Sequence, residues 1–448
     1  MSAYEGKRVL VVGLGESGKA AVRFFHSRGA RVTVADRRSA AELEGAIEEF
    51  RGLGVELALG EHSRDVFLAQ DLIVPSPGVP WDLSQLNSAR EEGIHVAGEL
   101  ETASRELRGR VVGVTGTNGK TTTTSLIGHI FQTAGITTEI GGNIGRPVLD
   151  LVETSTDSTW NVLELSSFQL EAMTSFRCHI AVVLNVTPDH LDRHGTFDGY
   201  AAAKAHIFGP QQAGDFAVLN HDDPTCRTFE KFVQGRTIWF SRTRTLAEGI
   251  CASEGWILRD GKRVCSTELP IRGTHNLENA LAAVGAASAA GIGDGRIARG
   301  LASFQPVEHR LEFVRRLDGV DYYNDSKATN VDAAIKALES FDKGVWLILG
   351  GRDKKSDYTA LQPVMKGRVN EVLLIGEAAT QIRGQLDAAT PLADCGTLEA
   401  AVRRAQRQAA AGDIVLLAPA CASFDQFENY GHRGREFKRI VNALGDAS

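Results

Sequence analysis

Runs of branched and aliphatic residues alternate with helix-like segments along almost the whole chain, for example in RVLVVG (8–13), RVVGVTG (110–116) and VWLILGG (345–351). Strands that are buried on both faces of a parallel sheet have this continuous apolar character, and helices form the crossovers between them. The alternation therefore predicts an α/β fold with parallel sheets.

Two changes in this pattern divide the chain. A short α/β unit ends near Gly98, before a second glycine-rich turn, and an alanine-rich helix ends shortly before Pro306, where a third set of strands begins. The chain has 448 residues, which is too long for one ordinary domain. We therefore predict three domains of ordinary size, at residues 1–98, 99–306 and 307–448.

Composition limits the classes of partner. The formal net charge is -7 and no block of basic residues is present, so no nucleic-acid partner is expected. No apolar run approaches the ~18 residues of a membrane span, and the N-terminus indicates a strand rather than a signal peptide. The six cysteines are scattered without a C-x-x-C pair, which is typical of inert thiols in a reducing compartment. We expect a cytoplasmic protein without membrane contact.

The strongest local signal is TGTNGKTTTT (115–124), which follows a strand-like run and precedes a helix-like segment. Glycines allow the backbone to wrap around phosphates, and the helix N-terminus adds N–H donors. Lys120 would reach the terminal phosphates, and Thr121 would offer its hydroxyl to Mg²⁺. Val114 stands where the strict P-loop pattern has its first glycine, so the motif is a variant of that pattern.

Another glycine-rich turn lies earlier in the chain, where Gly13, Gly15 and Gly18 fit the pattern G-x-G-x-x-G directly after the first strand. Asp36 ends the next strand, at the spacing at which an acid binds a ribose hydroxyl in dinucleotide-binding proteins. The motif admits three interpretations: a plain tight turn, an NAD(P) site, or a site for the diphosphate of another nucleotide. Glu16 would face a diphosphate unfavourably and is expected to point away from it.

Three residues of the central part are candidates for catalysis or metal binding. Glu164, in LELSSFQLE, ends a strand near the phosphate loop, where a carboxylate can hold Mg²⁺. His190 follows another strand in TPDHLDRHG and is a candidate metal ligand or proton carrier, although a lone histidine is more often structural. Lys204, in YAAAKAHIF, has no special feature by itself, and an ordinary lysine on a helix is its simplest interpretation.

A series of motifs occurs in one order along the chain: TGTNGKTT, GGNIG, LELSSFQLE, NVTPDHLDRHG, YAAAKAHIF, GTHNLENALAA, HRLE, YNDSKATN, LGGRDKK and APACASFDQF. Together they resemble the Mur ligases, over essentially the whole chain from Gly13 to the C-terminal helix. DSKATN and PACASFDQF are the specific parts, because the family members for L-alanine, diaminopimelate or D-alanyl-D-alanine differ there. These two segments resemble the branch that adds D-glutamate.

The resemblance implies a Rossmann-like N-terminal domain that binds a UDP-linked substrate, a central P-loop-type ATPase domain with a parallel sheet, and a Rossmann-like C-terminal domain that binds the amino acid. It also implies two Mg²⁺ ions. Thr121 and Glu164 would hold one ion, and His190 would hold the other together with Lys204, carbamylated by CO₂. Lys120, Glu164, His190 and Lys204 are thereby the expected catalytic residues.

The same resemblance assigns residues to three substrates: ATP, UDP-N-acetylmuramoyl-L-alanine and D-glutamate. Contacts with ATP are implied for Gly116, Thr117, Asn118, Gly119, Lys120, Thr121, Thr122, Asn279, Arg310, Asp325 and Lys327. Contacts with the UDP-linked substrate are implied for Ser17, Gly18, Asp36, Arg37, Gly78 and Asn143. Contacts with D-glutamate are implied for Thr329, Lys354, Ser423 and Phe424. Lys355 follows Lys354, and the choice between the two lysines depends on the alignment of this loop.

The expected reaction is ATP-dependent amide formation through an acyl phosphate, catalysed by a monomeric enzyme of peptidoglycan precursor synthesis. Three alternatives stay open at this point. A sister ligase would add another amino acid to a related substrate. An oxidoreductase would use the first glycine-rich turn and Asp36 for a nicotinamide cofactor. A nucleotide-binding switch would bind ATP without substrate-dependent turnover.

Overall fold

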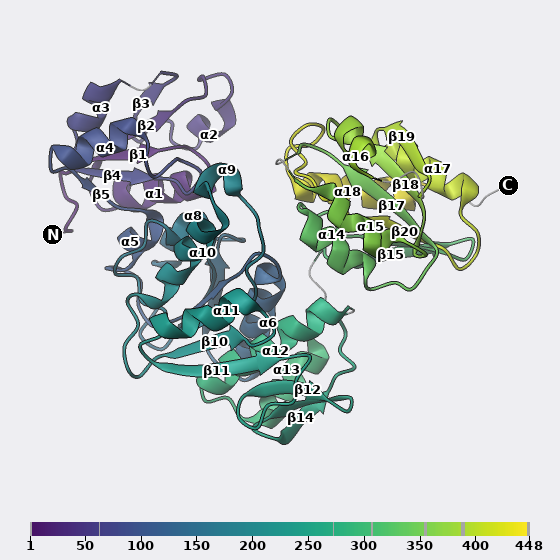
Figure 1. Ribbon diagram of the computed structural model, residues 1–448. Coiled ribbons are helices and arrows are strands. Elements are labelled where there is room, and N and C mark those ends of the chain that lie inside the picture. Colours follow the sequence, from purple (N-terminus) through teal and green to yellow (C-terminus); the bar gives the residue numbers. More distant parts are fainter. Residues whose placement is uncertain are drawn as a thin grey trace. The chain divides into compact units, whose positions relative to one another are not determined.

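The computed structural model describes residues 2–61, 63–271, 273–305, 308–353, 356–386 and 390–445 (Figure 1). Its contacts divide it into two compact units, Met1–Cys265 with Ala280–Gly300, and Ser266–Asn279 with Leu301–Ser448. The predicted boundary at Gly98 falls between the first sheet and the second, whereas Pro306 lies outside the described residues. The limits of the three domains therefore stay predictions.

The first sheet has five parallel strands in the order β3-β2-β1-β4-β5, the Rossmann-like arrangement predicted for the N-terminal part. Its elements are β1 (Arg8–Val12), α1 (Glu16–His26), β2 (Arg31–Asp36), α2 (Glu44–Glu48), β3 (Glu56–Leu59), α3 (Arg64–Leu68), β4 (Leu72–Pro75), α4 (Ser84–Glu91) and β5 (His95–Val96). Helix α1 packs with the sheet face that carries Val9 and Val11, and α3 and α4 pack with Leu10 on the other face. The strand order reverses between β1 and β4, which places a ligand crevice at the carboxyl ends of these strands.

The second sheet has nine strands in the order β14-β13-β12-β11-β10-β9-β6-β8-β7. Its strands are β6 (Arg110–Thr115), β7 (Thr138–Gly142), β8 (Trp160–Glu164), β9 (Ile180–Val183), β10 (Phe216–Asn220), β11 (Arg236–Ser241), β12 (Ile250–Ser253), β13 (Trp256–Arg259) and β14 (Lys262–Ser266). The helices of this part are α5 (Glu99–Ala103), α6 (Lys120–Thr133), α7 (Val148–Leu151), α8 (Ser167–Leu170), α9 (Leu191–His194), α10 (Phe197–Ala205), α11 (Pro224–Thr228), α12 (Thr274–Ala289) and α13 (Asp294–Ser303), with 3₁₀ turns η1 (His206–Phe208) and η2 (Phe229–Phe232).

The central sheet is parallel over most of its strands, as predicted, and it is mixed because one edge is antiparallel. Neighbouring strands from β7 to β12 run parallel, but β13 runs antiparallel to β12. Glu254 and Gly255 have φ of 50° and 78°, and Asp260 and Gly261 have φ of 50° and 74°. Two consecutive residues of positive φ form the tight turns of β-hairpins, so the chain reverses here without a crossover helix.

One hydrophobic core joins the first two sheets. Val9 and Phe25 of the N-terminal part belong to the same buried cluster as Leu100 of α5, Leu163 of β8 and Val183 of β9. Burial of a continuous apolar cluster holds its parts together, because separating them would expose this surface to water. The first glycine-rich turn and the phosphate loop therefore lie in one compact unit.

The third sheet has the order β15-β16-β20-β17-β18-β19. Its elements are β15 (Glu312–Leu317), β16 (Val320–Asn324), α14 (Val331–Leu338), β17 (Val345–Gly350), η3 (Tyr358–Leu361), α15 (Gln362–Met365), β18 (Val369–Ile375), α16 (Ala379–Gln385), β19 (Leu392–Gly396), α17 (Leu398–Gln408), β20 (Ile414–Leu417) and α18 (Tyr430–Asn442). Helices α14, α15 and α16 pack on one face, and α17 and α18 pack on the other. This sheet is also mixed, because β15 pairs antiparallel with β16 around Asp318 and Gly319, whose φ angles are 50° and 80°. Among the described residues, no helix has the length and apolarity to cross a membrane.

Candidate active site

The turn at residues 116–119 links β6 to α6, as the sequence predicts. Gly119 is the N-cap of α6 with φ 86°, a conformation that glycine adopts without a steric penalty. Nζ of Lys120 donates to Gly116 O at 2.8 Å and to Thr117 O at 2.7 Å, so the ammonium lies back over the turn. Backbone N–H groups, a helix N-terminus and a cation thus meet at one place, which suits a polyphosphate.

The loop after β9 fixes the shape of this turn. The N–H of Asn118 donates to Oδ1 of Asn185 at 2.8 Å, and Nδ2 of Asn185 donates to Asn118 O at 3.1 Å. Oγ1 of Thr117 donates to Thr187 O at 3.0 Å. Thr122, predicted to contact ATP, is buried in the first turn of α6. Sequence patterns do not single out Asn185, since its partner lies 67 residues away.

Glu164 ends β8 beside the phosphate loop and is 2% exposed. Its Oε2 accepts a hydrogen bond from Oγ1 of Thr121 at 2.6 Å, and its Oε1 accepts one from Nδ2 of Asn143 at 2.9 Å. Hydroxyl and carboxylate oxygens are the ligands that Mg²⁺ prefers, so Thr121 and Glu164 fit the predicted ion. Asn143, predicted to contact the UDP-linked substrate, lies at this carboxylate.

Lys204 lies in α10 and is 1% exposed. Its Nζ donates to Gly116 O at 3.0 Å and lies 4.5 Å from the ring centroid of Tyr200. Burial, together with the nearby ammonium of Lys120, lowers the pKa of Lys204 well below its ordinary value, although Asp189 acts in the opposite direction. The residue is therefore a buried amine at the phosphate loop rather than an ordinary helix lysine.

His190 stands at the N-terminus of α9 with φ 52°, an uncommon backbone conformation for a residue other than glycine. Its N–H donates to Oδ1 of Asp189 at 2.9 Å, and its Nε2 lies 3.7 Å from Oδ2 of the same residue. The imidazole packs edge-on against Phe168, with 4.8 Å between the ring centroids. The ring is thus oriented by its neighbours on a loop at the carboxyl ends of the strands.

Asp36, the acid beside the first glycine-rich turn, already accepts hydrogen bonds from groups of the protein. Oδ2 of Asp36 accepts from the N–H of Leu14 at 2.7 Å and from a terminal guanidinium nitrogen of Arg38 at 2.7 Å. Its Oδ1 accepts from the N–H and from Nε of Arg38, both at 3.0 Å. Burial would raise the pKa of Asp36, but the bonds from Arg38 and Leu14 outweigh it and lower the pKa to about 2. Four donors fill the lone-pair sites of a carboxylate, so Asp36 shapes the turn and offers little to a ribose.

The other residues predicted for the UDP-linked substrate lie around the same turn. Ser17 is in the first turn of α1 and donates to Oε2 of Glu99 at 2.8 Å. Gly18 packs so closely on Gly13 that an added Cβ would lie 2.0 Å from Gly13 O. Arg37 and Gly78 are exposed, and the guanidinium that meets Asp36 belongs to Arg38 instead.

In the second unit, Asp325 follows β16 and is 8% exposed. Burial raises the pKa of Asp325 to about 6, although the charge of Arg310 and the N–H of Leu311 oppose this shift. Lys327 lies with its Nζ 4.9 Å from the ring centroid of Tyr430. Asn279, in α12, donates from Nδ2 to Oδ1 of Asn276 at 3.0 Å. The assembly of these residues with the phosphate loop around one ATP stays a prediction.

The residues predicted for D-glutamate follow β16 and β20, which are neighbours in the third sheet. Thr329 is half-buried, Ser423 is buried, and the side chain of Phe424 is 62% exposed. Lys354, and Lys355 beside it, lie outside the described residues.

Arg433 connects the segments after β16 and β20, and sequence patterns do not reveal it. It lies in α18 and is 1% exposed. Its guanidinium donates to Ser326 Oγ at 3.0 Å, to Ser326 O at 2.7 Å and to Cys421 O at 3.2 Å. Burial lowers the pKa of Arg433 to about 10. From the local sequence, Arg433 looks like any basic residue on an amphipathic helix, and such residues are usually exposed to solvent.

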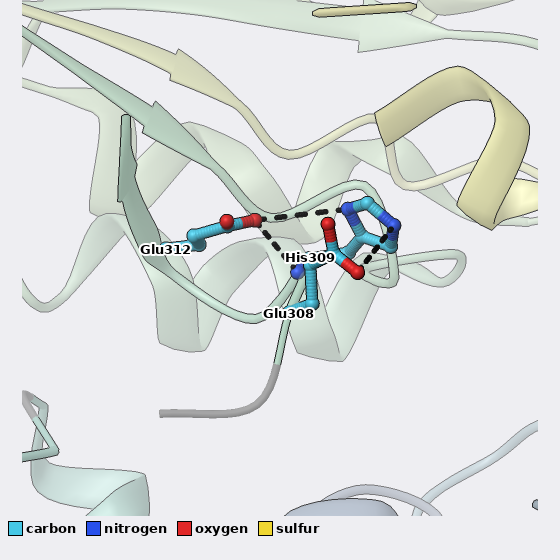
Figure 2. A group of neighbouring side chains, drawn as sticks. All are labelled: Glu308, His309 and Glu312. Carbon is cyan, nitrogen blue, oxygen red and sulfur yellow. Dashed lines mark hydrogen bonds and ion pairs between the residues drawn. The ribbon is translucent and has the colours of Figure 1, made fainter. Parts of the chain in front are cut away.

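Figure 2 shows Glu308, His309 and Glu312, whose ligand atoms are close enough for a metal ion. The two carboxylates already have a cationic partner within the protein. Nζ of Lys438 donates to Oε1 of Glu308 at 2.8 Å and to Oε1 of Glu312 at 2.6 Å. Nδ1 of His309 accepts from Nδ2 of Asn324 at 2.9 Å, if that ring nitrogen carries no hydrogen. The group is therefore a charge network that ties the start of β15 to α18.

Comparison with known proteins agrees with this arrangement of three sheets and a phosphate loop. Family models match residues 7–98 (Mur ligase MurD-like, N-terminal domain), 114–287 (Mur ligase middle domain) and 309–421 (Mur ligase, glutamate ligase domain). The chain belongs to the Mur ligase family. It is 52% identical to the UDP-N-acetylmuramoylalanine–D-glutamate ligase of Solibacter usitatus over 98% of both chains. Its identity to the enzyme of the same name from Koribacter versatilis is 50%, again over 98% of both chains.

Solved structures resemble the fold at low sequence identity. A pseudomurein peptide ligase type C from Methanothermus fervidus superposes with a TM-score of 0.64 at 19% identity, covering 98% of this chain and 100% of that one. The UDP-N-acetylmuramate-alanine ligase of Thermotoga maritima gives 0.63 at 19% identity, covering 98% of this chain and 99% of that one. These likenesses establish the three-part α/β fold.

Proposed function

We propose that this chain is the ligase that joins D-glutamate to UDP-N-acetylmuramoyl-L-alanine at the expense of ATP, in the synthesis of the peptidoglycan precursor. Relatives with this name match it over nearly its whole length at about half identity. The observation that carries the proposal is the phosphate loop with Thr121 on Glu164 and the buried Lys204 against Gly116. Cytoplasmic location and a monomeric state belong to the same proposal.

The chemistry follows from the weakness of a carboxylate as an acylating agent. Its leaving group would be oxide, whereas transfer of the γ-phosphoryl group of ATP gives an acyl phosphate whose leaving group is phosphate. The amine of D-glutamate attacks the carbonyl carbon, a tetrahedral intermediate forms and loses a proton, and phosphate departs. Lys120 is the protein cation placed to offset charge on the transferring phosphoryl group.

Two Mg²⁺ ions are assigned to residues around the phosphate loop, as the family pattern implies. Thr121 and Glu164 would hold one, and His190 would hold the other together with a carbamate on Lys204. Bound Mg²⁺ offsets the repulsion between ATP and the substrate carboxylate and draws charge from the phosphoryl oxygens. The chain's own contribution is to orient these ligands: Asn143 holds the second oxygen of Glu164, and the imidazole of His190 lies between Asp189, 3.7 Å from its Nε2, and Phe168.

Carbamylation of Lys204 requires a neutral amine, whose nitrogen lone pair forms a bond to the carbon of CO₂ with loss of one proton. An unperturbed lysine, with a pKa of about 10.4, is neutral in roughly one molecule in a thousand at neutral pH. Burial and the charge of Lys120 increase that fraction here. The product is an anionic oxygen ligand, which a hard cation stabilises.

The substrates are assigned as the family pattern implies. ATP would contact residues 116–122 with Asn279, Arg310, Asp325 and Lys327, and the diphosphate would lie at the first glycine-rich turn. The saturated carboxylate of Asp36 favours this interpretation over a nicotinamide cofactor, since the ribose contact of such a site has no acceptor left. Thr329, Lys354, Ser423 and Phe424 would bind D-glutamate.

The deciding experiment measures phosphate release with ATP, Mg²⁺ and UDP-N-acetylmuramoyl-L-alanine while the amino acid is varied. D-Glutamate is expected to support turnover far better than D-alanine or L-alanine, because a site built for a side-chain carboxylate leaves its own polar groups unpaired with the shorter amino acids. Equal use of L-alanine would point to a sister ligase. ATP binding without release under any combination would point to a nucleotide-binding switch.

A further inference from the structure

Glu99 lies in the first turn of α5, where three segments of the first unit meet, and it is 4% exposed. Oε2 accepts from Oγ of Ser17 at 2.8 Å, and Nε2 of Gln169 lies 3.5 Å from the same oxygen. Oε1 accepts from the N–H of Val148 at 2.7 Å. One carboxylate therefore joins the helix after the first glycine-rich turn to α7 and α8 of the central part.

The direction of the Ser17–Glu99 hydrogen bond decides what Ser17 can offer to a ligand. A serine hydroxyl has one hydrogen, and an ionised carboxylate can only accept, so Ser17 gives that hydrogen to Glu99. The oxygens of a diphosphate diester at neutral pH also only accept. Ser17 can donate to a diphosphate only when Glu99 no longer needs its hydrogen.

A diphosphate at Ser17 would also add negative charge beside Glu99. Within the described parts of the chain, no lysine, arginine or histidine forms an ion pair with this carboxylate. The charged groups on the surrounding elements have other partners: Lys19 with Glu16, Arg23 with Asp150, Arg193 and His194 with Glu171, and Glu101 with Thr174 and Ser175. A small cavity at the carboxyl edge of the first sheet is lined by residues that include Glu99, Ser76 and Gln169.

We propose that Glu99 takes up one proton from solvent when the diphosphate of the UDP-linked substrate binds, which reverses its hydrogen bond with Ser17. The protonated carboxyl donates to Oγ of Ser17, and Ser17 donates its own hydrogen to a phosphate oxygen. Glu99 is in this sense a positioning residue that acts through Ser17. The inference rests on the proposed function, since that function brings the diphosphate to Ser17.

The balance of forces on Glu99 favours this direction. Burial raises its pKa above the usual range, and the hydrogen bonds from Ser17, Val148 and Gln169 oppose that shift. A bound diphosphate withdraws the bond from Ser17 and adds repulsion, and both changes raise the pKa of the carboxyl further. Between the pKa of the unliganded protein and that of the complex, binding takes up a proton and weakens as the pH rises.

Isothermal titration calorimetry tests this directly with UDP-N-acetylmuramoyl-L-alanine near neutral pH, without ATP or Mg²⁺, in Pipes and in Tris. The dependence of the binding enthalpy on the ionisation enthalpy of the buffer gives the number of protons taken up. Wild-type protein is expected to take up as much as about one proton, with affinity falling up to about tenfold per pH unit in the window. Glu99→Gln has no titrating group, but its amide can still accept from Val148 and donate to Ser17. It is expected to bind without proton uptake, with an affinity that does not fall over the pH window in which the wild type weakens.

Glu101→Gln is the matched control, because Glu101 is also a buried carboxyl of α5 and accepts from Ser175 and Thr174. It is expected to show the proton uptake of the wild type. Equal uptake in wild type and Glu99→Gln, or none in the wild type, overturns the inference. Failure of the wild-type protein to bind the UDP-linked substrate at all would instead contradict the proposed function.

Discussion

Each of the two glycine-rich turns links a buried strand to the N-terminus of a helix, and each has an acid at the end of the adjacent strand. Beside the first turn, Asp36 receives four hydrogen bonds from the N–H of Leu14 and from Arg38. Beside the second turn, Glu164 receives hydrogen bonds from the uncharged side chains of Thr121 and Asn143. The same strand–turn–helix geometry thus gives one acid that pairs with a guanidinium of the protein and another that accepts from a hydroxyl and an amide.

The difference shows that the glycine pattern specifies the turn, whereas the side chains around it specify the chemistry. The first turn is followed by Ser17, whose hydroxyl is bound within the protein, and the second by Lys120 and Thr121. An acid paired with a guanidinium stabilises a loop, and an acid beside a hydroxyl offers oxygen ligands of the kind that Mg²⁺ prefers. Changes at equivalent positions of the two turns are therefore expected to differ in kind.

The largest effect is expected for Lys120→Ala. The ammonium lies over the turn through Gly116 and Thr117, and its loss removes the cation proposed to offset charge on the transferring phosphoryl group. Such a loss costs ~3 kcal/mol or more of transition-state stabilisation, about a hundredfold or more in kcat. The matched change in the first turn is Lys19→Ala, since Lys19 also follows the last glycine of its turn and pairs with Glu16 and Glu49. Phosphate-release kinetics are expected to be near wild type for Lys19→Ala, and comparable losses in both variants would contradict the comparison.

The next effect is expected at Lys204, which has no counterpart at the first turn. Lys204→Ala removes a buried amine that contacts Gly116, and turnover is expected to fall to about one per cent, ~3 kcal/mol in barrier height. Formate or acetate is expected to restore part of the activity by supplying a carboxylate in the vacated space. Lys204→Glu is expected to restore less, since its carboxylate lies closer to the backbone than a carbamate would. Full activity of Lys204→Ala in CO₂-depleted buffer would reject the carbamate.

Asp36→Asn is expected to lower stability rather than turnover. The pKa of Asp36 lies at about 2 against an ordinary value of 3.8, so its ionised form contributes roughly 2 kcal/mol to folding. Because the folded-state pKa is lowered, this contribution is complete above the ordinary value and is lost as the pH falls towards 2. Urea unfolding of wild type and Asp36→Asn at neutral pH and near pH 3 measures this contribution, and the difference in unfolding free energy is expected to shrink at the lower pH.

Asp71→Asn is the control for that measurement. Asp71 binds Arg8 in a similar fork and its pKa is also lowered to about 2, but the side chains are 40% and 54% exposed. Water screens this pair, so the loss is expected to stay below about 1 kcal/mol in spite of the similar pKa. An equal loss of unfolding free energy in both variants would mean that burial of Asp36 does not strengthen its contribution to stability.

The features recognised from sequence are those whose cause is local. Continuous apolar strands predict the parallel parts of the three sheets, and the glycine patterns predict both strand–turn–helix units. The antiparallel edges also had a local signal that the alternation obscured: Asp260–Gly261 and Asp318–Gly319 are two-residue hairpin turns with positive φ at both positions. Aspartate followed by glycine between two apolar runs is the pattern that predicts such a turn.

The residues that sequence reasoning missed act over long separations. Glu99 meets Ser17 across 82 residues, Asn185 meets Asn118 across 67, and Arg433 meets Ser326 across 107. Nothing in the segment around each of them distinguishes a buried, fully bonded side chain from an exposed one, because the partner is set by the packing of the sheets. Position by position, the assignments for ATP, the UDP-linked substrate and D-glutamate stay predictions.

The smallest effect on stability is expected for Gly15→Ala in the first turn. A Cβ at Gly15 meets nothing within 4 Å, and its φ of -85° suits any residue, whereas a Cβ at Gly18 would lie 2.0 Å from Gly13 O. Alanine is a poorer N-cap than glycine but orders the unfolded chain, so the stability of Gly15→Ala is expected to stay within ~0.5 kcal/mol. Gly18→Ala is expected to lose about 1–3 kcal/mol through overpacking.

The same methyl group at Gly15 is expected to weaken binding of the UDP-linked substrate by roughly tenfold, ~1.4 kcal/mol, because the second glycine of this pattern lets the backbone approach a diphosphate. Calorimetric titration and urea unfolding of the same preparation separate the two effects. Unchanged affinity in a stable Gly15→Ala would place the diphosphate away from this turn. The contrast between a first turn that binds a diphosphate and a second turn that supports phosphoryl transfer would then fail.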